Sequence, residues 1–531
     1  MKKTTTLIIL LAAAVMFGCQ KPRAIVVIPE PVEITPKSGQ FTIDSRTTLC
    51  FGNLGAEASE TSKIIRELYE QYFGMRPNLG DAESAKKRSI LFSVSEKEIK
   101  GIGSEGYVLR VRPNRIVAEA NTAAGLFYAM QTLMQMAGTD KLADSKSFAV
   151  PCAVITDYPR FGYRGAHLDV SRHFFDTAFV KKYIDMLAFY KINKFHWHLT
   201  DDHGWRVQTD QYPELTRVGA WRPERTSWDT LHPVRPDEPM TYGGFYTKEQ
   251  IRDIVHYAAV RGIDVVPEMD FPGHSLAEIR CYPWLSCHGD GIEPLCLGND
   301  RVLDFCKKVF DEVFDLFPYE YVEIGGDEVI RERWSGCELC QERIRKEGLA
   351  DVAQLQAWFT REMEKHFNAQ GRKMVGWDEI LDGGVSPTAT VNWWRSDPVT
   401  FKKAAVNGNE IIMCPTTHCY FDYAQDDQTM RHLYEDNLIP ETLTPDERKL
   451  IKGMQANIWC EFIPTESRMQ TMVFPRAIAL AEKTWTPMEA HDFEDFVARL
   501  KDQLGRLDIM GVDYRPLDAG LTVGFNTIMF H

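Results

Sequence analysis

The last two thirds of the chain alternate between apolar, strand-like segments and helical segments. The eight strand-like segments begin at Gly165, Lys194, Ile263, Tyr321, Lys373, Ala389, Glu410 and Lys452. Four of the segments between them have the apolar period of an amphipathic helix, at residues 177–192, 247–262, 299–317 and 351–367. This alternation predicts an α/β fold, a (β/α)8 TIM barrel over residues 155–531, with its active site at the carboxyl ends of the strands.

The region before the barrel, residues 24–154, has a mixed pattern. We expect strands at Phe41–Asp44, Ser89–Val94, Glu105–Val111 and Arg115–Ala120. Helical apolar faces end at Gly74 and begin after Asn121, which is a candidate N-cap. The region contains no recognisable catalytic motif. We therefore predict a small α+β domain that supports the barrel.

The first 18 residues are typical of an export signal. Two lysines precede an apolar run from Leu7 to Phe17, which is too short to span a membrane comfortably. Gly18 followed by Cys19 resembles a bacterial lipoprotein signal, in which Cys19 is the acylated first mature residue; the alternative is an ordinary signal peptide with a chance cysteine. We expect an exported protein, periplasmic or lipid-anchored in the outer membrane, that touches the membrane only through this anchor. The absence of acidic residues in residues 20–23 favours the periplasmic side.

Composition excludes some classes of function. The chain has 61 Lys and Arg against 75 Asp and Glu, a net charge of -14, which argues against a nucleic-acid partner. Its 44% hydrophobic content excludes general disorder. Twelve Trp and 19 Tyr suit carbohydrate recognition.

Eleven cysteines follow Cys19, so at least one thiol is unpaired within the chain. Cys337 and Cys340 form a single CxxC pair without the second pair or the histidines typical of a zinc site. We interpret this pair as structural or as a local disulfide, with a metal site as the minor alternative. Cys281 and Cys287 are a second possible short bridge.

The fourth strand ends in the sequence GGDEV, at residues 325–329. Neighbouring strand residues point in opposite directions, so Asp327 and Glu328 do not suit the acid and nucleophile that face each other in an ordinary retaining glycosidase. A different division of work fits better. One carboxyl protonates the leaving oxygen, and the other orients a group of the substrate.

Seven motifs occur in order along the barrel: SRHF, HWHLTDDHGWR, PEMDFPGHS, IGGDE, WDE, YFDYAQ and WCE. Together they resemble the β-N-acetylhexosaminidases of glycoside hydrolase family 20, and residues 24–154 resemble the small N-terminal domain of that family. The resemblance implies an exo-acting, retaining enzyme that removes terminal β-linked GlcNAc or GalNAc from glycans. The substrate's own acetamido oxygen would be the nucleophile, through an oxazolinium intermediate. It implies no cofactor and no catalytic metal.

The resemblance also assigns the catalytic residues. Glu328 would be the general acid/base, and Asp327 would orient and charge-stabilise the 2-acetamido group. Glu328 must carry a proton near neutral pH, which we expect burial or coupled neighbours to provide. Asp201 and His274 resemble the family's pair that tunes this acid.

The remaining strand ends would form the sugar site. Arg172 would hold the outer hydroxyls, and Tyr420 would donate a hydrogen bond to the acetamido carbonyl. Three tryptophans would form apolar walls: Trp377, Trp394 and Trp459. Two carboxylates would accept bonds from the hydroxyls at C4 and C6: Asp422 and Glu461. One departure is Glu323, where the family commonly has His; alternation places it inside the barrel, where it needs a partner or a proton.

Three alternatives remain open at this stage. A silent glycan-binding lipoprotein would keep the pocket without turnover. A lacto-N-biosidase would share the motifs but release a disaccharide. A metal-dependent hydrolase would use His196, His198 and His203, the first two of which share one face of a strand.

Overall fold

The computed structural model describes residues 25–54, 58–138, 146–225 and 237–529. The predicted signal peptide and Cys19 lie outside these residues. None of the helices described is both long and apolar enough to cross a membrane.

The barrel forms as predicted, and all eight of its strands are confirmed. The strands close in the order β14-β15-β16-β17-β18-β19-β8-β9. Their bounds are β8 (Tyr163–Asp169), β9 (Lys194–His198), β14 (Asp264–Glu268), β15 (Tyr321–Glu323), β16 (Lys373–Trp377), β17 (Thr390–Trp393), β18 (Glu410–Met413) and β19 (Ile451–Ala456). Every neighbouring pair is parallel, so the carboxyl ends of all eight strands lie at one rim.

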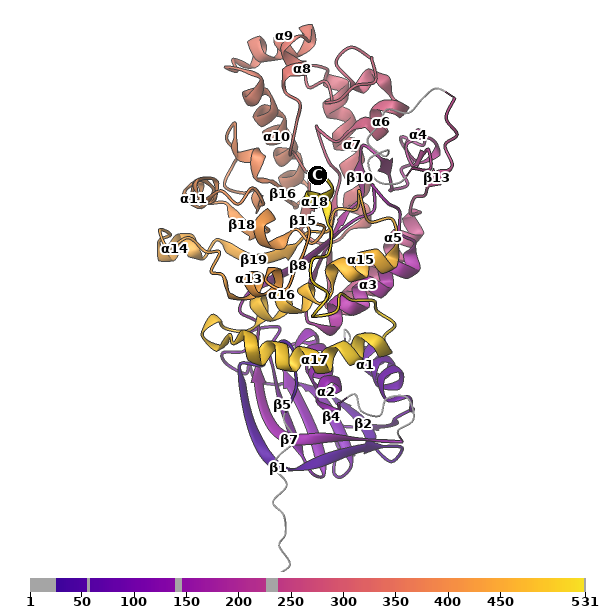
Figure 1. Cartoon of the computed structure of the whole chain (residues 1–531), viewed down its shortest axis with the longest axis vertical. Helices are drawn as coiled ribbons and strands as arrows, with labels where there is room; N and C mark the ends of the chain where they lie inside the picture. The colour runs from indigo at the N-terminus through magenta and orange to yellow at the C-terminus, as the bar shows by residue number, and fades with distance from the viewer. Residues whose placement is uncertain (1–24, 55–57, 139–145, 226–236, 530–531) are drawn as a thin grey trace, which may run out of the picture.

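Helices surround this barrel (Figure 1). The main ones are α3 (Thr177–Phe189), α5 (Lys248–Ala259), α7 (Asp300–Leu316), α10 (Val352–Ala369), α11 (Pro398–Asn407), α15 (Glu466–Val473) and α16 (Arg476–Trp485). Sequence explains where several begin: Asp176 caps α3, and Thr247 with Gln250 forms a capping box at α5. The four predicted helices are confirmed.

Short elements lie mostly in the loops at the rim and on the barrel surface. They are β10 (Thr200–Asp201), β11 (Gly204–Trp205), α4 (Glu214–Arg217), β12 (Trp221–Arg222), β13 (Tyr242–Gly243), α6 (Leu276–Cys281), η2 (Pro283–Leu285), α8 (Glu332–Ser335), α9 (Glu338–Glu347), η3 (Asp378–Leu381), α12 (Thr416–Cys419), α13 (Thr429–Glu435), α14 (Pro445–Arg448), η4 (Met488–Ala490) and α18 (Phe525–Met529).

The N-terminal domain is a sheet of seven described strands covered by two helices. The strand order is β1-β7-β5-β6-β4-β2-β3. The bounds are β1 (Glu33–Asp44), β2 (Thr48–Gly52), β3 (Asn78–Asp81), β4 (Ser89–Val94), β5 (Tyr107–Arg112), β6 (Arg115–Ala120), β7 (Ser147–Asp157), α1 (Ala58–Phe73) and α2 (Ala123–Met136). The sequence predicted only four of these strands, and the last strand runs to Asp157, beyond the boundary predicted at residue 154.

Helix α17 (Phe493–Ile509) joins the two domains, lying between the barrel and helices α1 and α2 (Figure 1). Arg499 donates to both carboxylate oxygens of Glu482 at 2.7 and 2.8 Å, and Gln503 donates to Gln135 in α2 at 3.2 Å. Arg506 donates to the Tyr72 hydroxyl of α1. The end of the chain therefore holds the N-terminal domain against the barrel, below the rim that carries the site.

Candidate active site

Nine of the eleven predicted site residues line one pocket at the carboxyl rim of the barrel. They are Arg172, His274, Asp327, Glu328, Trp394, Tyr420, Asp422, Trp459 and Glu461. The other two, Asp201 and Trp377, are buried directly behind its lining, each 1% exposed. Segments separated by almost 300 residues are thus brought to one place by barrel closure.

The two glycines after β15 shape the loop that carries the catalytic candidates. Gly325 and Gly326 have φ values of 73° and 94°, in the left-handed region that favours glycine. The N–H of Gly326 donates to Oδ1 of Asp270 at 3.2 Å, and a Cβ on Gly325 would lie 1.9 Å from the same oxygen. The close approach of a neighbouring carboxyl, on the loop after β14, therefore requires a glycine here.

Asp327 is a buried carboxyl with an open acceptor. Its side chain is only 10% exposed, and Oδ1 has no hydrogen-bond partner among the described residues. Burial, together with the negative charges of Glu268 and Glu328, raises the pKa of Asp327 to about 6. The carboxylate is therefore ionised at neutral pH and available to a donor from a ligand.

Glu328 lies at the mouth of the pocket instead. Its side chain is 61% exposed, so burial, one of the two means by which we expected this acid to keep its proton, is not found here. Its backbone is in the left-handed region, at φ 49°, which is uncommon for a residue other than glycine. The carboxyl of Glu328 is therefore accessible to a ligand that enters the pocket.

His274 lies between two pairs of carboxyls. Its Nε2 is 3.7 Å from both Oδ2 of Asp327 and Oε2 of Glu328. Its Nδ1 is 3.5 Å from Asp201 and 3.6 Å from Asp202. Burial disfavours a charged imidazole, but these carboxylates outweigh it and raise the pKa of His274 well above its ordinary value. A charged His274 thus couples the two catalytic candidates to Asp201.

Behind Asp201 the chain of charges continues into the barrel. Nε2 of His198 lies 3.0 Å from Asp201, and Nδ1 of His198 contacts Glu268. Burial opposes protonation, yet Glu268 and Asp201 raise the pKa of His198 to about 10. Sequence reasoning did not assign this positioning role to His198 and Glu268, although both lie on predicted strands.

The histidines proposed for the metal-dependent alternative have other partners. Nε2 of His196 lies 2.9 Å from Glu268, the carboxylate that His198 also contacts. His203 lies instead beside Asp201, with Nδ1 3.9 Å from its Oδ1. The structure therefore places His196 and His198 in the charge network and His203 at its edge.

Aromatic rings form the pocket walls. Trp394 and Tyr420 stack with ring centroids 6.0 Å apart, and Nε1 of Trp394 donates to Glu379 at 2.9 Å. The ring of Trp377 lies behind that of Trp459, with their centroids 5.6 Å apart, and its Nε1 donates to Glu268 at 2.8 Å, so Trp377 supports the wall and does not line the pocket. These hydrogen bonds fix the rings that an apolar ligand face would contact.

Charged groups lie beside these rings. Nη2 of Arg172 lies 2.7 Å from Asp201, Nη1 lies 3.6 Å from Glu461, and its guanidinium is 5.0 Å from the Trp459 ring centre. Burial and the neighbouring Glu461 raise the pKa of Asp422 well above its ordinary value. The pocket therefore combines apolar rings with charged groups that can bind hydroxyls.

The comparisons with known proteins agree with this geometry. Residues 161–488 match the model for "Glycosyl hydrolase family 20, catalytic domain", and residues 24–158 match that for "Glycosyl hydrolase family 20, domain 2". The chain belongs to glycosyl hydrolase family 20. The predicted family and fold class are thereby confirmed.

Relatives and solved structures extend the match over nearly the whole chain. A beta-hexosaminidase of Porphyromonas gingivalis is 37% identical over 93% of this chain and 64% of its own length, so the chain spans less than two thirds of that relative. One of Vibrio furnissii is 34% identical over 86% of this chain and 75% of its own length. The exo beta-N-acetylglucosaminidase of Vibrio harveyi, solved with N-acetylglucosamine, is 33% identical with a TM-score of 0.82, over 92% of this chain and 78% of that one.

Glu323, the departure from the family 20 pattern, points into the barrel as alternation predicted. It is fully buried and opposes Glu268 in the β14–β15 register. Its partner is Asn392, whose Nδ2 donates to Oε2 at 2.8 Å. Burial and the charges of Glu268 and Asp327 raise the pKa of Glu323 well above its ordinary value. None of its contacts in the described residues is with an Arg, and the raised pKa favours the protonated acid, the second of the two expected solutions.

The family 20 pocket also includes two residues that sequence reasoning missed, Tyr423 and Phe525. Their rings stack at 5.9 Å with an interplanar angle of 9°. The Phe525 N–H donates to the carbonyl of Asp422 at 2.8 Å, which holds α18 at the pocket mouth. Tyr423 lies within a quoted motif, but no sequence pattern connects it to a residue about a hundred positions later.

The two disulfides that the sequence left open are not formed. All eleven described cysteines are free thiols. Sγ of Cys281 donates to the carbonyl of Ala277 at 3.2 Å, and Cys287 lies instead 3.9 Å from Cys340. The Cys281–Cys287 and Cys337–Cys340 disulfides are therefore wrong for this structure, because the fold directs each partner elsewhere.

Proposed function

We propose that this family 20 protein is an exo-acting, retaining β-N-acetylhexosaminidase that removes terminal β-linked GlcNAc or GalNAc from glycans. The observation that carries the proposal is the buried acceptor Oδ1 of Asp327 beside the exposed acid Glu328, at the end of an aromatic pocket. A glycosidase with two opposed carboxyls would need both at the sugar's anomeric carbon. One buried and one exposed carboxyl suit two different parts of the substrate.

In the first step the substrate supplies the nucleophile. Asp327 accepts the acetamido N–H, and Tyr420 donates to the acetamido carbonyl, so that the carbonyl oxygen faces the anomeric carbon. That oxygen bonds to the anomeric carbon as the glycosidic bond breaks, and Glu328 gives its proton to the leaving oxygen. Holding this internal nucleophile in place supplies much of the rate, because it removes the entropy cost of a bimolecular reaction. The Asp327 carboxylate stabilises the positive charge of the oxazolinium ring.

In the second step water enters on the side that the leaving group vacated. Glu328 takes a proton from this water, whose oxygen bonds to the anomeric carbon, and the oxazolinium ring opens to restore the acetamide. The two inversions give net retention. His274 would stabilise the ionised Glu328 after the first step, because its Nε2 lies 3.7 Å from the carboxyl.

The test is turnover of a chromogenic N-acetylglucosaminide. We expect release of chromophore by the wild type and a loss of about 10²–10⁴-fold in Glu328→Gln, the range typical of general acid–base catalysis. The loss should be greatest with poor leaving groups. A matched control is Glu332→Gln, four residues further along the chain at the exposed start of α8, which should keep full activity. A thiazoline analogue of the oxazoline should inhibit the wild type.

The same experiment separates the alternatives. Sugar binding without turnover would establish a silent binding protein. Release of a disaccharide rather than a monosaccharide from a defined oligosaccharide panel would establish a lacto-N-biosidase. A covalent glycosyl ester on any side chain would exclude the substrate-assisted mechanism.

We further propose that the protein is exported and anchored by a lipid on Cys19, on the periplasmic side. The support is the lysine-containing, apolar leader that ends in Gly18 and Cys19. Labelling of cells with a fatty-acid analogue should mark the wild type but not Cys19→Ser. Equal labelling of both would contradict the anchor.

A further inference from the structure

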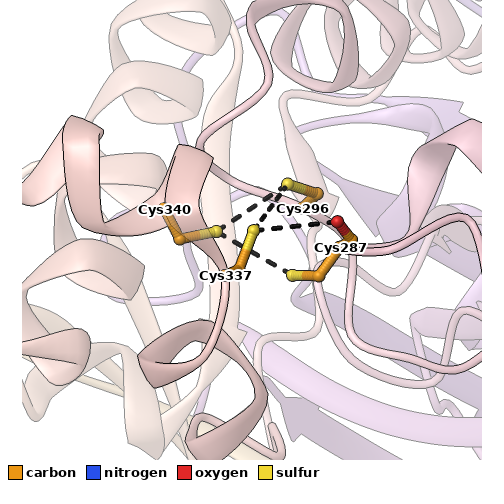
Figure 2. A group of neighbouring side chains, drawn as sticks. All are labelled: Cys287, Cys296, Cys337 and Cys340. Atoms are coloured by element: carbon orange, nitrogen blue, oxygen red, sulfur yellow. Dashed lines mark hydrogen bonds between the residues drawn. The ribbon is translucent and has the colours of Figure 1, made fainter.

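Four cysteine side chains meet beside the active-site loops (Figure 2). Cys287 and Cys296 come from the loop between η2 and α7, while Cys337 and Cys340 come from the start of α9. The Sγ–Sγ distances are 3.9 Å for Cys287–Cys340, 3.7 Å for Cys296–Cys337 and 3.8 Å for Cys296–Cys340. All four sulfur atoms lie within 4.8 Å of one another. Two segments about 40 residues apart therefore supply two thiols each.

These distances distinguish between two chemistries. Sulfur atoms in a disulfide are about 2.05 Å apart, which none of the three distances approaches. Zinc binds thiolates at about 2.3 Å, and four ligands at that distance in a tetrahedron have edges of about 3.8 Å. The spacing of the thiols matches the edges of that tetrahedron.

We propose that Cys287, Cys296, Cys337 and Cys340 bind one zinc ion as a structural tetrathiolate site. Four sulfur ligands in tetrahedral geometry favour zinc among the common divalent metals. Because all four positions are taken by protein ligands, the site has no open position for a substrate and is not catalytic. The sequence left a metal site at Cys337 and Cys340 as the minor alternative, and it did not identify the other two ligands because Cys287 and Cys296 are separated by eight residues and form no CxxC motif.

Two of the four thiols lie at the N-terminus of a helix. Cys337 is the N-cap residue of the ten-residue helix α9, and Cys340 lies in its first turn. The unpaired N–H groups at a helix N-terminus carry partial positive charge, which stabilises thiolates. Three of the four side chains are buried and Cys287 is half-buried, so a metal ion would reach the site past Cys287.

The backbone also brings the two pairs together. A Cβ on Gly298 would lie 2.1 Å from the carbonyl carbon of Leu339 and 2.3 Å from the nitrogen of Cys340, so only glycine permits this approach. Trp334 is fully buried and donates to the carbonyl of Leu295 at 2.9 Å. The loop that carries Cys296 is thus held against α9 by contacts other than the thiols.

The site connects the two loops that carry the catalytic groups. The segment between β14 and α7, which contains Cys287 and Cys296, also includes His274, before α6. The chain that leads to Cys337 begins at Glu328, nine residues earlier. The zinc would therefore fix the position of His274 relative to Glu328 and act on catalysis only by positioning.

The first experiment measures metal in the full-length wild type, purified without chelator from cells grown with zinc. We expect about one zinc per chain by elemental analysis and by native mass spectrometry. X-ray absorption should show four sulfur neighbours at about 2.3 Å. A zinc-free chain that is lighter by four hydrogens, with two disulfides among these cysteines, would overturn the proposal, as would iron in place of zinc.

The second experiment uses two variants. Cys337→Ser/Cys340→Ser should contain no zinc, whereas Cys281→Ser should keep it; Cys281 is a half-buried thiol of the neighbouring segment and is bonded only to backbone carbonyls in the described residues. Full zinc content in the double variant would overturn the proposal. If the double variant does not fold, the metal content and thiol count of the wild type still decide the question.

A third measurement separates positioning from chemistry. Removal of zinc by a strong chelator should lower the melting temperature and raise KM. It should leave the pH profile of kcat nearly unchanged. Unchanged stability and kinetics after complete zinc removal would contradict the positioning role. The metal count does not depend on turnover, so this proposal and the proposed hydrolase activity fail separately.

Discussion

The domain interface and the centre of the barrel bury charged groups in opposite ways. At the interface, Lys191 and Asp157 are both fully buried, with Nζ 2.8 Å from the carboxylate. Asp157 also accepts bonds from Trp485 at 2.7 Å and from Tyr107 at 2.6 Å. At the barrel centre, burial raises the pKa of four carboxyls: Asp270, Glu323, Asp327 and Asp422.

The difference separates structural charges from functional ones. Asp157 has donors for both oxygens, and its carboxylate has no free acceptor left for a ligand. Asp270, Glu323 and Asp327 each keep one oxygen without a partner among the described residues. Buried, unsatisfied carboxyls destabilise a fold, so their concentration at one rim indicates a site kept ready for a substrate.

Breaking the interface pair should have the largest effect. Lys191→Met leaves Asp157 buried without its cation, which should lower the unfolding free energy by about 3–5 kcal/mol. Denaturant unfolding checks this, and kcat of the folded protein should change little. The double variant Lys191→Met/Asp157→Asn leaves no unpaired buried charge. It should therefore regain much of the unfolding free energy that the single variant loses. A single variant as stable as the wild type would show that the pair is not what holds the interface.

Asp327→Asn should have the next largest effect, on activity alone. Losing the counter-charge of the oxazolinium should lower kcat/KM by about 10²–10³-fold, or about 3–4 kcal/mol. Its stability at pH 7 should equal or exceed that of the wild type, because a buried charge has been removed. Near-normal turnover in this variant would end the substrate-assisted assignment.

The pH dependence of activity and stability tests the same difference between the two regions, because a shift of one pKa unit corresponds to about 1.4 kcal/mol. Asp327 must be ionised, and its pKa is raised to about 6. We expect kcat/KM to fall about tenfold for each pH unit below 6. Stability should run in the opposite direction: because the folded-state pKa is raised, this group's favourable contribution is complete below pH 4 and is lost as pH rises through 6. Urea unfolding of the wild type and of Asp327→Asn from about pH 4 to 7 isolates the contribution of Asp327. If the unfolding free energies of the two proteins had the same slope with pH, the raised pKa of Asp327 would be contradicted.

Glu323→Gln should have the smallest effect. A protonated glutamic acid and a glutamine have the same shape and no charge, and Gln keeps an acceptor for Asn392. The change in unfolding free energy should stay below about 1 kcal/mol, the scale of one neutral hydrogen bond. Turnover should be nearly unchanged. A loss as large as that of Asp327→Asn would mean that Glu323 acts as a charge.

The barrel could be predicted from the sequence because its strands are short apolar runs separated by amphipathic helices. The N-terminal sheet was harder. β1 is exposed along much of its length, and β7 contains Pro151, which argues against a central strand. Pro151 is tolerated because the pairing of β7 with β5 reaches only Ala153, so only β1 lies beside Pro151.

The site was predictable where the motifs are contiguous, and less so where chemistry depends on distant contacts. Asp327 and Glu328 are adjacent in one motif, but their different exposure follows from backbone angles that the sequence does not display. The charged His198 depends on Glu268, 70 residues later. Phe525 reaches the pocket only because α18 returns to the rim.

Helix α17 has a consequence for how such proteins can be cut or recombined. It begins at Phe493, after the last residue matched to either family segment, 488, yet it touches both. A gene fragment trimmed to those two segments would expose the buried faces of Gln135 and Glu482 that α17 covers. The two matched family segments are therefore smaller than the unit that folds. A recombination that transfers both segments into a new protein must also transfer α17.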